Sequence, residues 1–337
     1  MKISLYLEYY HFMGGFLFKK IGTGLLSSYE NQRKFLTHAG IAFSEVYEAD
    51  CDILQINTPW LKSLYLMKKS RKNGKKIIVW SHVTAEDVVG VFRFAAFFAP
   101  LVKKYLTYAY NLADVIFSPT EYTKKLLIAY GITSEKIIVV SNGVDVDLIH
   151  NDLAKRELYR KQYNLKSLTI GFVGLVIPRK GIKTFIEMSK KFSKQQFIWY
   201  GKIYSSFLVE PLPKELPANL NFTGFAPDRN AVFNSLDVFL FPSYEENEGV
   251  AILEAAAVGL PILVRDIPVY EGWLIHNENC LKAKTDQEFE VCLGLLINDE
   301  ALRQRLSTQA KVLAEARSKK VLAKKVEEIY TKLVDNK

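Results

Sequence analysis

Short apolar runs alternate with longer segments of helical periodicity in the first part of the chain. The apolar runs are rich in Ile, Val and Leu and read KISLYLEY, CDILQIN, KKIIVWSH, DVIFSPT and KIIVVSNG. Between them, apolar residues recur at the spacing of amphipathic helices. Buried strands that alternate with helices form parallel sheets with helices on both faces, so this part is predicted to be a doubly wound α/β domain.

The same alternation starts again after a polar and charged stretch at residues 145–166. Its apolar runs read LTIGFVGL, QFIWYG, LNFTGF, DVFLFPS and LPILVRD. We therefore predict two Rossmann-like domains with parallel sheets, over residues 1–160 and 161–315. The carboxyl ends of their strands should face a central cleft, where such sheets bind ligands. A charged helix at residues 316–337 is expected to pack back on the N-terminal domain.

Composition narrows the class of protein. The chain has 337 residues, of which 49% are hydrophobic, so it can bury two cores. Its net charge of +9 favours anionic partners: phosphates, nucleic acid or an anionic membrane. The cysteines form no CxxC pair, which fits a reducing cytoplasm, and no signal peptide is expected from MKISLYLEYY. No apolar tract reaches the roughly 20 residues that span a bilayer.

Residues 241–264, FPSYEENEGVAILEAAAVGLPILV, carry the strongest chemical signal. An apolar strand ending leads into an acidic loop and then a helix that should open near Gly249. With that start, Glu254 lies on the second turn and Glu246 in the loop above the helix. Free N–H groups at the positive helix end then lie between two carboxylates, which suits the phosphate and hydroxyls of a nucleotide sugar. Alternatively, both acids only stabilise the helix start.

Three further strand ends are candidates for the same cleft. Arg179 and Lys180 follow a strand at a helix start, where cations are normally unfavourable, so an anionic ligand such as a pyrophosphate is favoured over a solvated turn. Gly22 and Gly24 allow either a close backbone approach or a plain turn. His82 ends the run IIVWSH beside two acids and either faces the cleft or is structural.

A basic segment at residues 60–76 lacks acids and includes aromatic residues. Such a surface suits an anionic membrane, although a solvated face is the alternative. Nucleic acid is not expected as a partner, because no binding motif supports it. For the aromatic stripe at residues 94–108 we expect the domain core for most members. The membrane or acceptor candidates are Trp60, Lys68, Lys69, Arg71 and Lys72.

Together these segments resemble the retaining glycosyltransferases of family 4, which have the GT-B fold. Glu246 and Glu254 match the E-x7-E signature of that family. Further matches are the IPRKG turn and residues 118–122, 141–145 and 221–224. Within the family, the run VRDIPVYEGWL and the loop SYEENEG are similar to bacterial enzymes that add a second hexose to monohexosyl-diacylglycerol.

The resemblance implies a hexosyltransferase that moves glucose or galactose from UDP-glucose or UDP-galactose to a glycolipid acceptor, with retention and without a covalent nucleophile. Arg179 and Lys180 would stabilise the leaving diphosphate, Glu246 would bind the hexose, and His82 would contact the sugar or the acceptor. Glu254 would bind the ribose. The remaining donor-binding residues would be Gly22, Gly24, Gly224, Gly249 and Val250. No metal or other cofactor is expected, because fixed cations carry the phosphate.

Some positions depart from the family pattern and leave other functions open. Asn247 and Glu248 replace the usual Gly-Phe, and Leu175 replaces an Arg whose phosphate role Arg179 is expected to take. The alternatives are a family 4 transferase with a polysaccharide or other non-lipid acceptor, a glycoside hydrolase, and a non-catalytic sugar-binding protein. The favoured hypothesis places the enzyme in the cytoplasm, peripherally bound to the inner face of the membrane.

Overall fold

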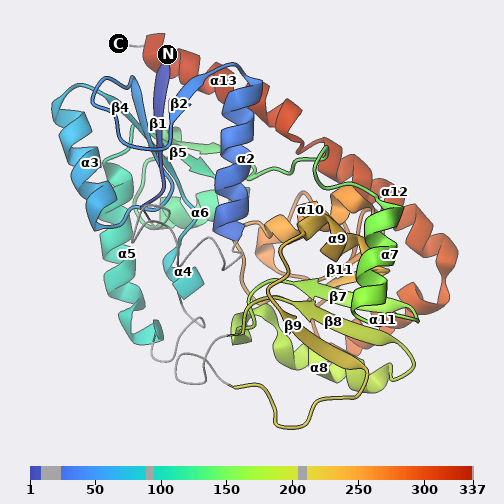
Figure 1. Cartoon of the computed structure of the whole chain (residues 1–337). Helices are drawn as coiled ribbons and strands as arrows, with labels where there is room; N and C mark the ends of the chain where they lie inside the picture. Colours follow the sequence, from blue (N-terminus) through green and yellow to red (C-terminus); the bar gives the residue numbers. More distant parts are fainter. Residues whose placement is uncertain (9–23, 89–94, 204–210, 336–337) are drawn as a thin grey trace.

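The structure is a computed structural model that describes residues 1–8, 24–88, 95–203 and 211–335. Within these residues the chain forms two α/β units, one above the other in Figure 1. Each contains a parallel sheet of six strands, so the predicted doubly wound architecture is confirmed. None of the helices in the described ranges has the length and hydropathy needed to cross a membrane.

The N-terminal sheet has the strand order β2-β1-β3-β4-β5-β6, and every pairing in it is parallel. Helices cover both faces, and the short strand β2 at one edge was not predicted. The strands are β1 (Lys2–Tyr6), β2 (Ala42–Ser44), β3 (Ile53–Ile56), β4 (Lys76–Trp80), β5 (Val115–Ser118) and β6 (Ile137–Val139). The helices are α2 (Gly24–His38), α3 (Leu61–Lys72), α4 (Ala85–Val88), α5 (Ala95–Asn111) and α6 (Glu121–Ala129).

The C-terminal sheet has the order β12-β11-β10-β7-β8-β9 and is also parallel. Its strands are β7 (Thr169–Val173), β8 (Gln196–Tyr200), β9 (Leu220–Gly224), β10 (Val238–Phe241), β11 (Ile262–Arg265) and β12 (Leu281–Ala283). Its helices are α7 (Leu153–Gln162), α8 (Ile182–Lys191), α9 (Arg229–Asn234), α10 (Val250–Val258), α11 (Asp286–Asn298) and α12 (Glu300–Glu315). Aromatic rings fill its core: Phe172 stacks on Trp199 at 3.8 Å and on Phe241 at 4.9 Å between centroids.

The polar stretch between the two sheets is more ordered than its composition suggested. Residues 153–162 form α7, which packs against α9. The Asp152 side chain caps this helix by accepting from the amide of Lys155 at 3.0 Å. Arg156 pairs with Asp237 at the start of β10. A capped helix with one buried face therefore joins the C-terminal sheet, although most of its residues are polar.

The last helix, α13 (Lys319–Asp335), returns to the N-terminal unit and packs along α2 (Figure 1). Val326 and Tyr330 are buried in the core of that unit. The Tyr330 hydroxyl donates to Gln55 on β3. The chain therefore crosses between the two units twice, which limits how far they can separate.

Side chains at the carboxyl ends of both sheets meet across the boundary between the units. The backbone carbonyl of Asn247 accepts a hydrogen bond from Thr120 at 3.0 Å. The Tyr122 hydroxyl on α6 donates to Glu245 at 3.2 Å. Burial, with the neighbouring negative charge of Asp87 as the next cause, raises the pKa of Glu245 to about 7. In the folded protein this carboxyl therefore keeps its proton up to near neutral pH.

The raised pKa of Glu245 predicts how stability depends on pH. The folded carboxyl holds its proton up to about pH 7, whereas the unfolded one loses it near its ordinary pKa of 4.5. The stability that this proton contributes is therefore complete below pH 4.5 and lost as pH rises through 7. Glu245→Gln removes that loss and keeps an acceptor for Tyr122. Its stability relative to the parent should rise from pH 5 to pH 8 by on the order of 1 kcal/mol, after discounting for solvent screening.

Thermal or urea unfolding at both pH values measures this difference between the two proteins. A difference that stays constant, or that falls toward pH 8, would contradict the raised pKa of Glu245.

Candidate functional site

The acidic loop and the helix after it lie at the carboxyl end of β10, as predicted. Helix α10 begins at Val250, and Gly249 before it has a φ of +89°, which favours glycine. Glu254 therefore lies on the second helical turn and Glu246 in the loop above the helix. Both side chains are buried. The helix start thus opens between two buried carboxylates.

The turn with Arg179 and Lys180 packs directly against this loop. It forms a short 3₁₀ helix, Pro178–Lys180, and Gly181 after it has a φ of +77°. A Cβ at Gly181 would lie 2.2 Å from the carbonyl oxygen of Pro242, so only glycine permits this approach. The close contact of the turn with the end of β10 brings the Lys180 side chain to Glu246.

Lys180 and Glu246 form a buried ion pair at the centre of the site. The Lys180 ammonium also lies 5.4 Å from the centroid of the Phe241 ring, and Ser243 donates to Glu246 at 2.5 Å. Burial alone would raise the pKa of Glu246, but Lys180 and Arg179 outweigh it and hold the pKa below its ordinary value. Glu246 is therefore an ionised acceptor beside a fixed cation.

Arg179 reaches across the domain boundary to Asp87 in α4. Its Nη1 donates to Asp87 Oδ1 at 3.2 Å and to the carbonyl oxygen of Glu245. The Asn247 side chain donates to the same Asp87 and to the carbonyl oxygen of His82 at 2.9 Å. Burial raises the pKa of Asp87, although Arg179 opposes that shift. Asp87 is thus the N-terminal partner of the predicted phosphate-binding turn.

His82 lies at the carboxyl end of β4 and stacks on Trp80, with 5.5 Å between ring centroids. Its Nε2 is 3.1 Å from Asn57 Oδ1 and 3.2 Å from the side-chain nitrogen Nε2 of Gln32. Gln55 connects Gln32, at 2.8 Å, to Tyr330 on α13. Burial lowers the pKa of His82 to about 3, so its imidazole is neutral at physiological pH.

Glu254 is held by Arg229, the first residue of α9. Arg229 Nη1 donates to Glu254 Oε1 at 2.7 Å and to the hydroxyl of Ser27 at 2.5 Å. Its Nη2 donates to Glu30 at 2.8 Å. Ser27 and Glu30 belong to α2, so the second signature carboxylate is also connected to the N-terminal unit.

The predicted glycines that the structure describes belong to both units. Gly24 is the first residue of α2, and a Cβ on it would lie 4.0 Å from Val250 Cγ2, so the starts of α2 and α10 are adjacent. Gly224 ends β9 with a φ of +76°. Gly22 lies outside the described residues. In the described ranges, no group of three or more His, Cys, Asp or Glu side chains lies close enough together to hold a metal ion.

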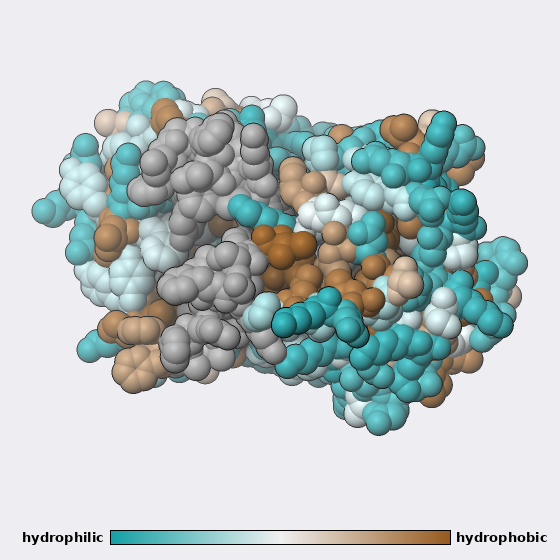
Figure 2. All heavy atoms as spheres, turned by 60° about the horizontal axis from the view of Figure 1, so that its bottom comes forward, coloured by the Kyte–Doolittle hydropathy of each residue, from teal (hydrophilic) through white to brown (hydrophobic). Residues whose placement is uncertain are grey.

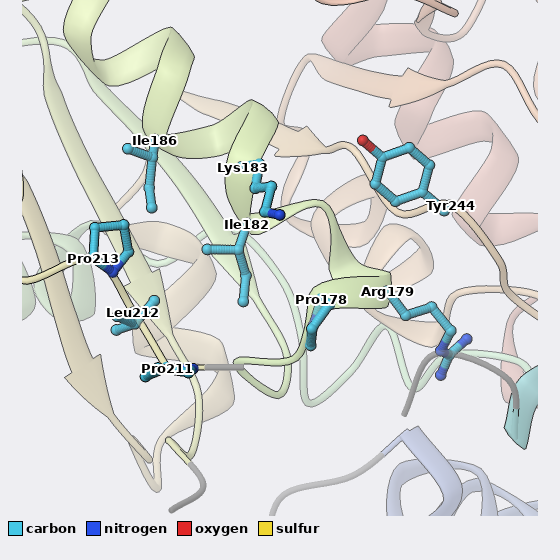
Figure 3. Close-up of a pocket in the computed structure, with 9 residues that line it drawn as sticks. All are labelled: Pro178, Arg179, Ile182, Lys183, Ile186, Pro211, Leu212, Pro213 and Tyr244. Atoms are coloured by element: carbon cyan, nitrogen blue, oxygen red, sulfur yellow. The ribbon is translucent and has the colours of Figure 1, made fainter. Parts of the chain in front are cut away.

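A pocket of about 370 Å³ lies between the turn that carries Arg179 and helix α8 (Figure 3). Its walls are mainly apolar and come from the turn, from α8 and from residues 211–213, with Tyr244 at one side. Figure 2 shows apolar surface near the middle of the face that it draws.

The predicted membrane surface combines cations of α3 with aromatic residues of α5. The Lys68 ammonium lies 5.3 Å from the centroid of the Tyr108 ring, and Trp60 is 44% exposed. The expectation that most of the aromatic stripe is core is wrong for Phe97, Phe98, Leu101 and Tyr108, which are exposed. Helix α5 projects past the sheet in Figure 1, so its first half has no sheet to pack on; Phe94 lies outside the described residues.

Sequence reasoning found both signature glutamates, the cationic turn and His82 but missed several of their partners. Arg229 follows the carboxyl end of β9, so the strand-end argument used for Arg179 could have found it. Asp87 was noted only as an acid near His82. Its contact with Arg179 joins residues 92 positions apart, which no local pattern indicates.

Comparisons with known proteins agree with this geometry. Residues 17–148 match the family described as Glycosyltransferase Family 4, and residues 155–313 match Glycosyl transferases group 1. A processive diacylglycerol alpha-glucosyltransferase of Acholeplasma laidlawii is 31% identical over 89% of this chain and 89% of that protein. An alpha-galactosylglucosyldiacylglycerol synthase of Streptococcus pneumoniae is 27% identical over 90% of this chain and 84% of that protein.

Comparison with solved structures identifies the same fold. The crystal structure of Anabaena HepE in complex with UDP and glucose aligns with a TM-score of 0.78 at 15% identity. The alignment covers 98% of this chain and 100% of that one. With this fold, these matches and the E-x7-E pair at the start of α10, the chain belongs to the family 4 glycosyltransferases of GT-B fold.

Proposed function

We propose that this glycosyltransferase moves glucose or galactose from a UDP-sugar to monohexosyl-diacylglycerol, with retention, and so makes a diglycosyl-diacylglycerol. The observation that carries the proposal is the start of α10, where Glu246 and Glu254 flank free amides beside Arg179 and Lys180. In a UDP-sugar the anionic diphosphate lies between two groups with hydroxyls, the hexose and the ribose. The diphosphate would meet the amides and cations, and the hydroxyls would meet the two carboxylates. The names of the relatives support a diacylglycerol-linked acceptor, and the UDP and glucose bound to HepE support the donor.

The main task of the protein in this transfer would be to stabilise the transition state electrostatically. As the bond between the anomeric carbon and the β-phosphate oxygen breaks, negative charge grows on the diphosphate and positive charge on the sugar ring. Lys180, Arg179 and the amides at Gly249 and Val250 would stabilise the first. The ionised Glu246 would bind the hexose hydroxyls. Lys180 is already held by Glu246, so its ammonium needs no large reorganisation when the diphosphate arrives.

Retention is supported by the alpha linkages in the names of both relatives, since the sugar of UDP-glucose is itself α-linked. The acceptor hydroxyl would attack from the face that the diphosphate leaves, and a diphosphate oxygen would take the acceptor proton. A neutral His82 can donate to or accept from a sugar hydroxyl in this step without adding charge.

A lipid acceptor requires contact with the membrane, and α3 and α5 are the proposed surface. Their exposed aromatic side chains would enter the interface while cations contact anionic headgroups. The enzyme would then act peripherally at the inner face of the cell membrane.

Direct assay tests the reaction. UDP-glucose and UDP-galactose are incubated in turn with diacylglycerol and monohexosyl-diacylglycerol in mixed micelles, and the lipids are separated by chromatography. One donor should give a diglycosyl-diacylglycerol. Lys180→Ala should lose about 2–4 kcal/mol of transition-state stabilisation, whereas Lys190→Ala, at the exposed end of α8, serves as the matched control.

Three outcomes would contradict the proposal. Transfer to soluble saccharides alone would favour a polysaccharide acceptor, and sugar release from a simple glycoside without nucleotide would favour a hydrolase. Equal kinetics for Lys180→Ala and the parent would remove the phosphate role of Lys180.

Because Arg179 and Lys180 would carry the charge of the diphosphate, we predict that transfer needs no divalent metal. The rate in EDTA should equal the rate in Mg²⁺ or Mn²⁺ within about twofold, since Lys180 and Arg179 supply the positive charge. Loss of transfer on chelation that Mg²⁺ or Mn²⁺ restores would show that a metal carries the diphosphate.

The basic segment of α3 predicts salt-dependent binding to anionic membranes. Each cation near such a surface contributes on the order of 1 kcal/mol, and the attraction decays within a Debye length. Replacing Lys68, Lys69, Arg71 and Lys72 by Ser should weaken binding to phosphatidylglycerol vesicles in low salt and leave UDP binding intact.

The matched control replaces four exposed lysines of the C-terminal unit by Ser, namely Lys161, Lys166, Lys190 and Lys194. Vesicle sedimentation compares both variants with the parent. If both lose binding equally, only net charge matters, and if neither does, the α3 cations form a solvated face.

A further inference from the structure

Arg229 joins the second signature carboxylate to the N-terminal unit through one guanidinium. It donates to Glu254 Oε1 at 2.7 Å and to Glu30 Oε2 at 2.8 Å, so it lies between two carboxylates. Glu254 is 5% exposed, whereas the Arg229 side chain is about a quarter exposed. The buried carboxylate therefore has its cation on the side that faces α2.

The other charged groups near Glu254 lie on α2 and on the loop after β6. Glu30 opposes ionisation of Glu254, and Lys34 favours it. Lys34 is itself paired with Asp145 at 2.8 Å, and Asp145 is also paired with Lys319. In the part of the chain that the structure describes, Arg229 is thus the cation that contacts Glu254, while Lys34 is paired with another acid.

We infer that Arg229 is the positioning residue for ribose recognition, because it holds the Glu254 carboxylate and supplies its counter-charge. This inference rests on the proposed function, in which Glu254 accepts from the ribose hydroxyls. Arg229 donates to Oε1 through Nη1, so a ribose hydroxyl would donate to Oε2.

The same cation also affects how well Glu254 can act as an acceptor. Burial raises the pKa of Glu254, and among the described residues Arg229 opposes that shift most. Without Arg229, the carboxyl would face the negative charge of Glu30 and would hold a proton closer to neutral pH. A protonated Glu254 has lost its charge and one of its acceptor positions, so it binds a diol less well.

Donor binding as a function of pH tests the inference. UDP-glucose and UDP-galactose are titrated into the full-length protein by calorimetry between pH 6 and 8.5, and the tighter ligand is compared with its 2′-deoxyribose analogue. The parent should bind with nearly constant affinity and prefer the ribose form about tenfold. Arg229→Gln should lose most of this preference at pH 6 and recover affinity at least fivefold as pH rises.

Two further variants separate electrostatics from folding. Glu30→Gln in the Arg229→Gln background removes the facing negative charge, so it should shift the pH dependence back toward lower pH. Lys155→Gln is the matched control: it removes a cation that pairs with Asp228, next to Arg229, at 2.9 Å, but does not contact Glu254. It should keep the flat pH profile of the parent.

The outcomes distinguish the inference from the proposed function. A parent that binds neither UDP-sugar overturns the proposed function, and the inference with it. A parent that binds while Arg229→Gln shows the same affinity and ribose preference at every pH overturns only the inference. A loss in Arg229→Gln that is equal at all pH values and for both sugars also overturns it, because a merely structural role predicts that result.

Discussion

The burial of carboxylates between two domains is the constraint on which the cleft depends. Glu246, Glu248 and Glu254 are each less than a tenth exposed, and an ionised carboxylate without partners is costly in such surroundings. Each has its own compensation: Lys180 and Ser243 for Glu246, Ser141 and the amide of Asn142 for Glu248, and Arg229 for Glu254. The partners of Glu248 belong to the N-terminal unit, so the hydrogen bonds of this carboxyl form only when both units are in place.

Such pairs explain the organisation of the site better than they explain its stability. A buried ion pair contributes little net stability, because desolvation of both charges offsets their attraction. In the proposed function, the pair would hold Lys180 in place before the diphosphate arrives, and a fixed charge stabilises a transition state without reorganising. Burial raises the pKa of Glu254 and Glu248 as well, and it raises that of Glu245, which has no cation at its carboxylate in the described contacts, to about 7.

Local sequence patterns predicted the parts of the site that local geometry determines. Gly249 and the spacing of Glu246 and Glu254 place both carboxylates once the helix start is known, whereas the strand-end argument left His82 either facing the cleft or structural. The partners that come from the other domain could not be predicted this way: Arg229 and Ser27 are 202 positions apart. Helical spacing also gave the face of the α5 stripe but not whether a sheet lies against it, which is why Phe97 was expected in the core.

Two arginines of the C-terminal unit each pair with a carboxylate of the N-terminal unit, Arg179 with Asp87 and Arg229 with Glu30. The two pairs differ in what a donor would do to them. Ribose would use the free edge of Glu254 and leave Arg229 in place, whereas a diphosphate would compete with Asp87 for Arg179. Because burial already raises the pKa of Asp87, that carboxyl can take up a proton when its arginine turns to the diphosphate. In the proposed function, this exchange would leave no unpaired buried charge, so the two domains would stay in contact while the donor is bound.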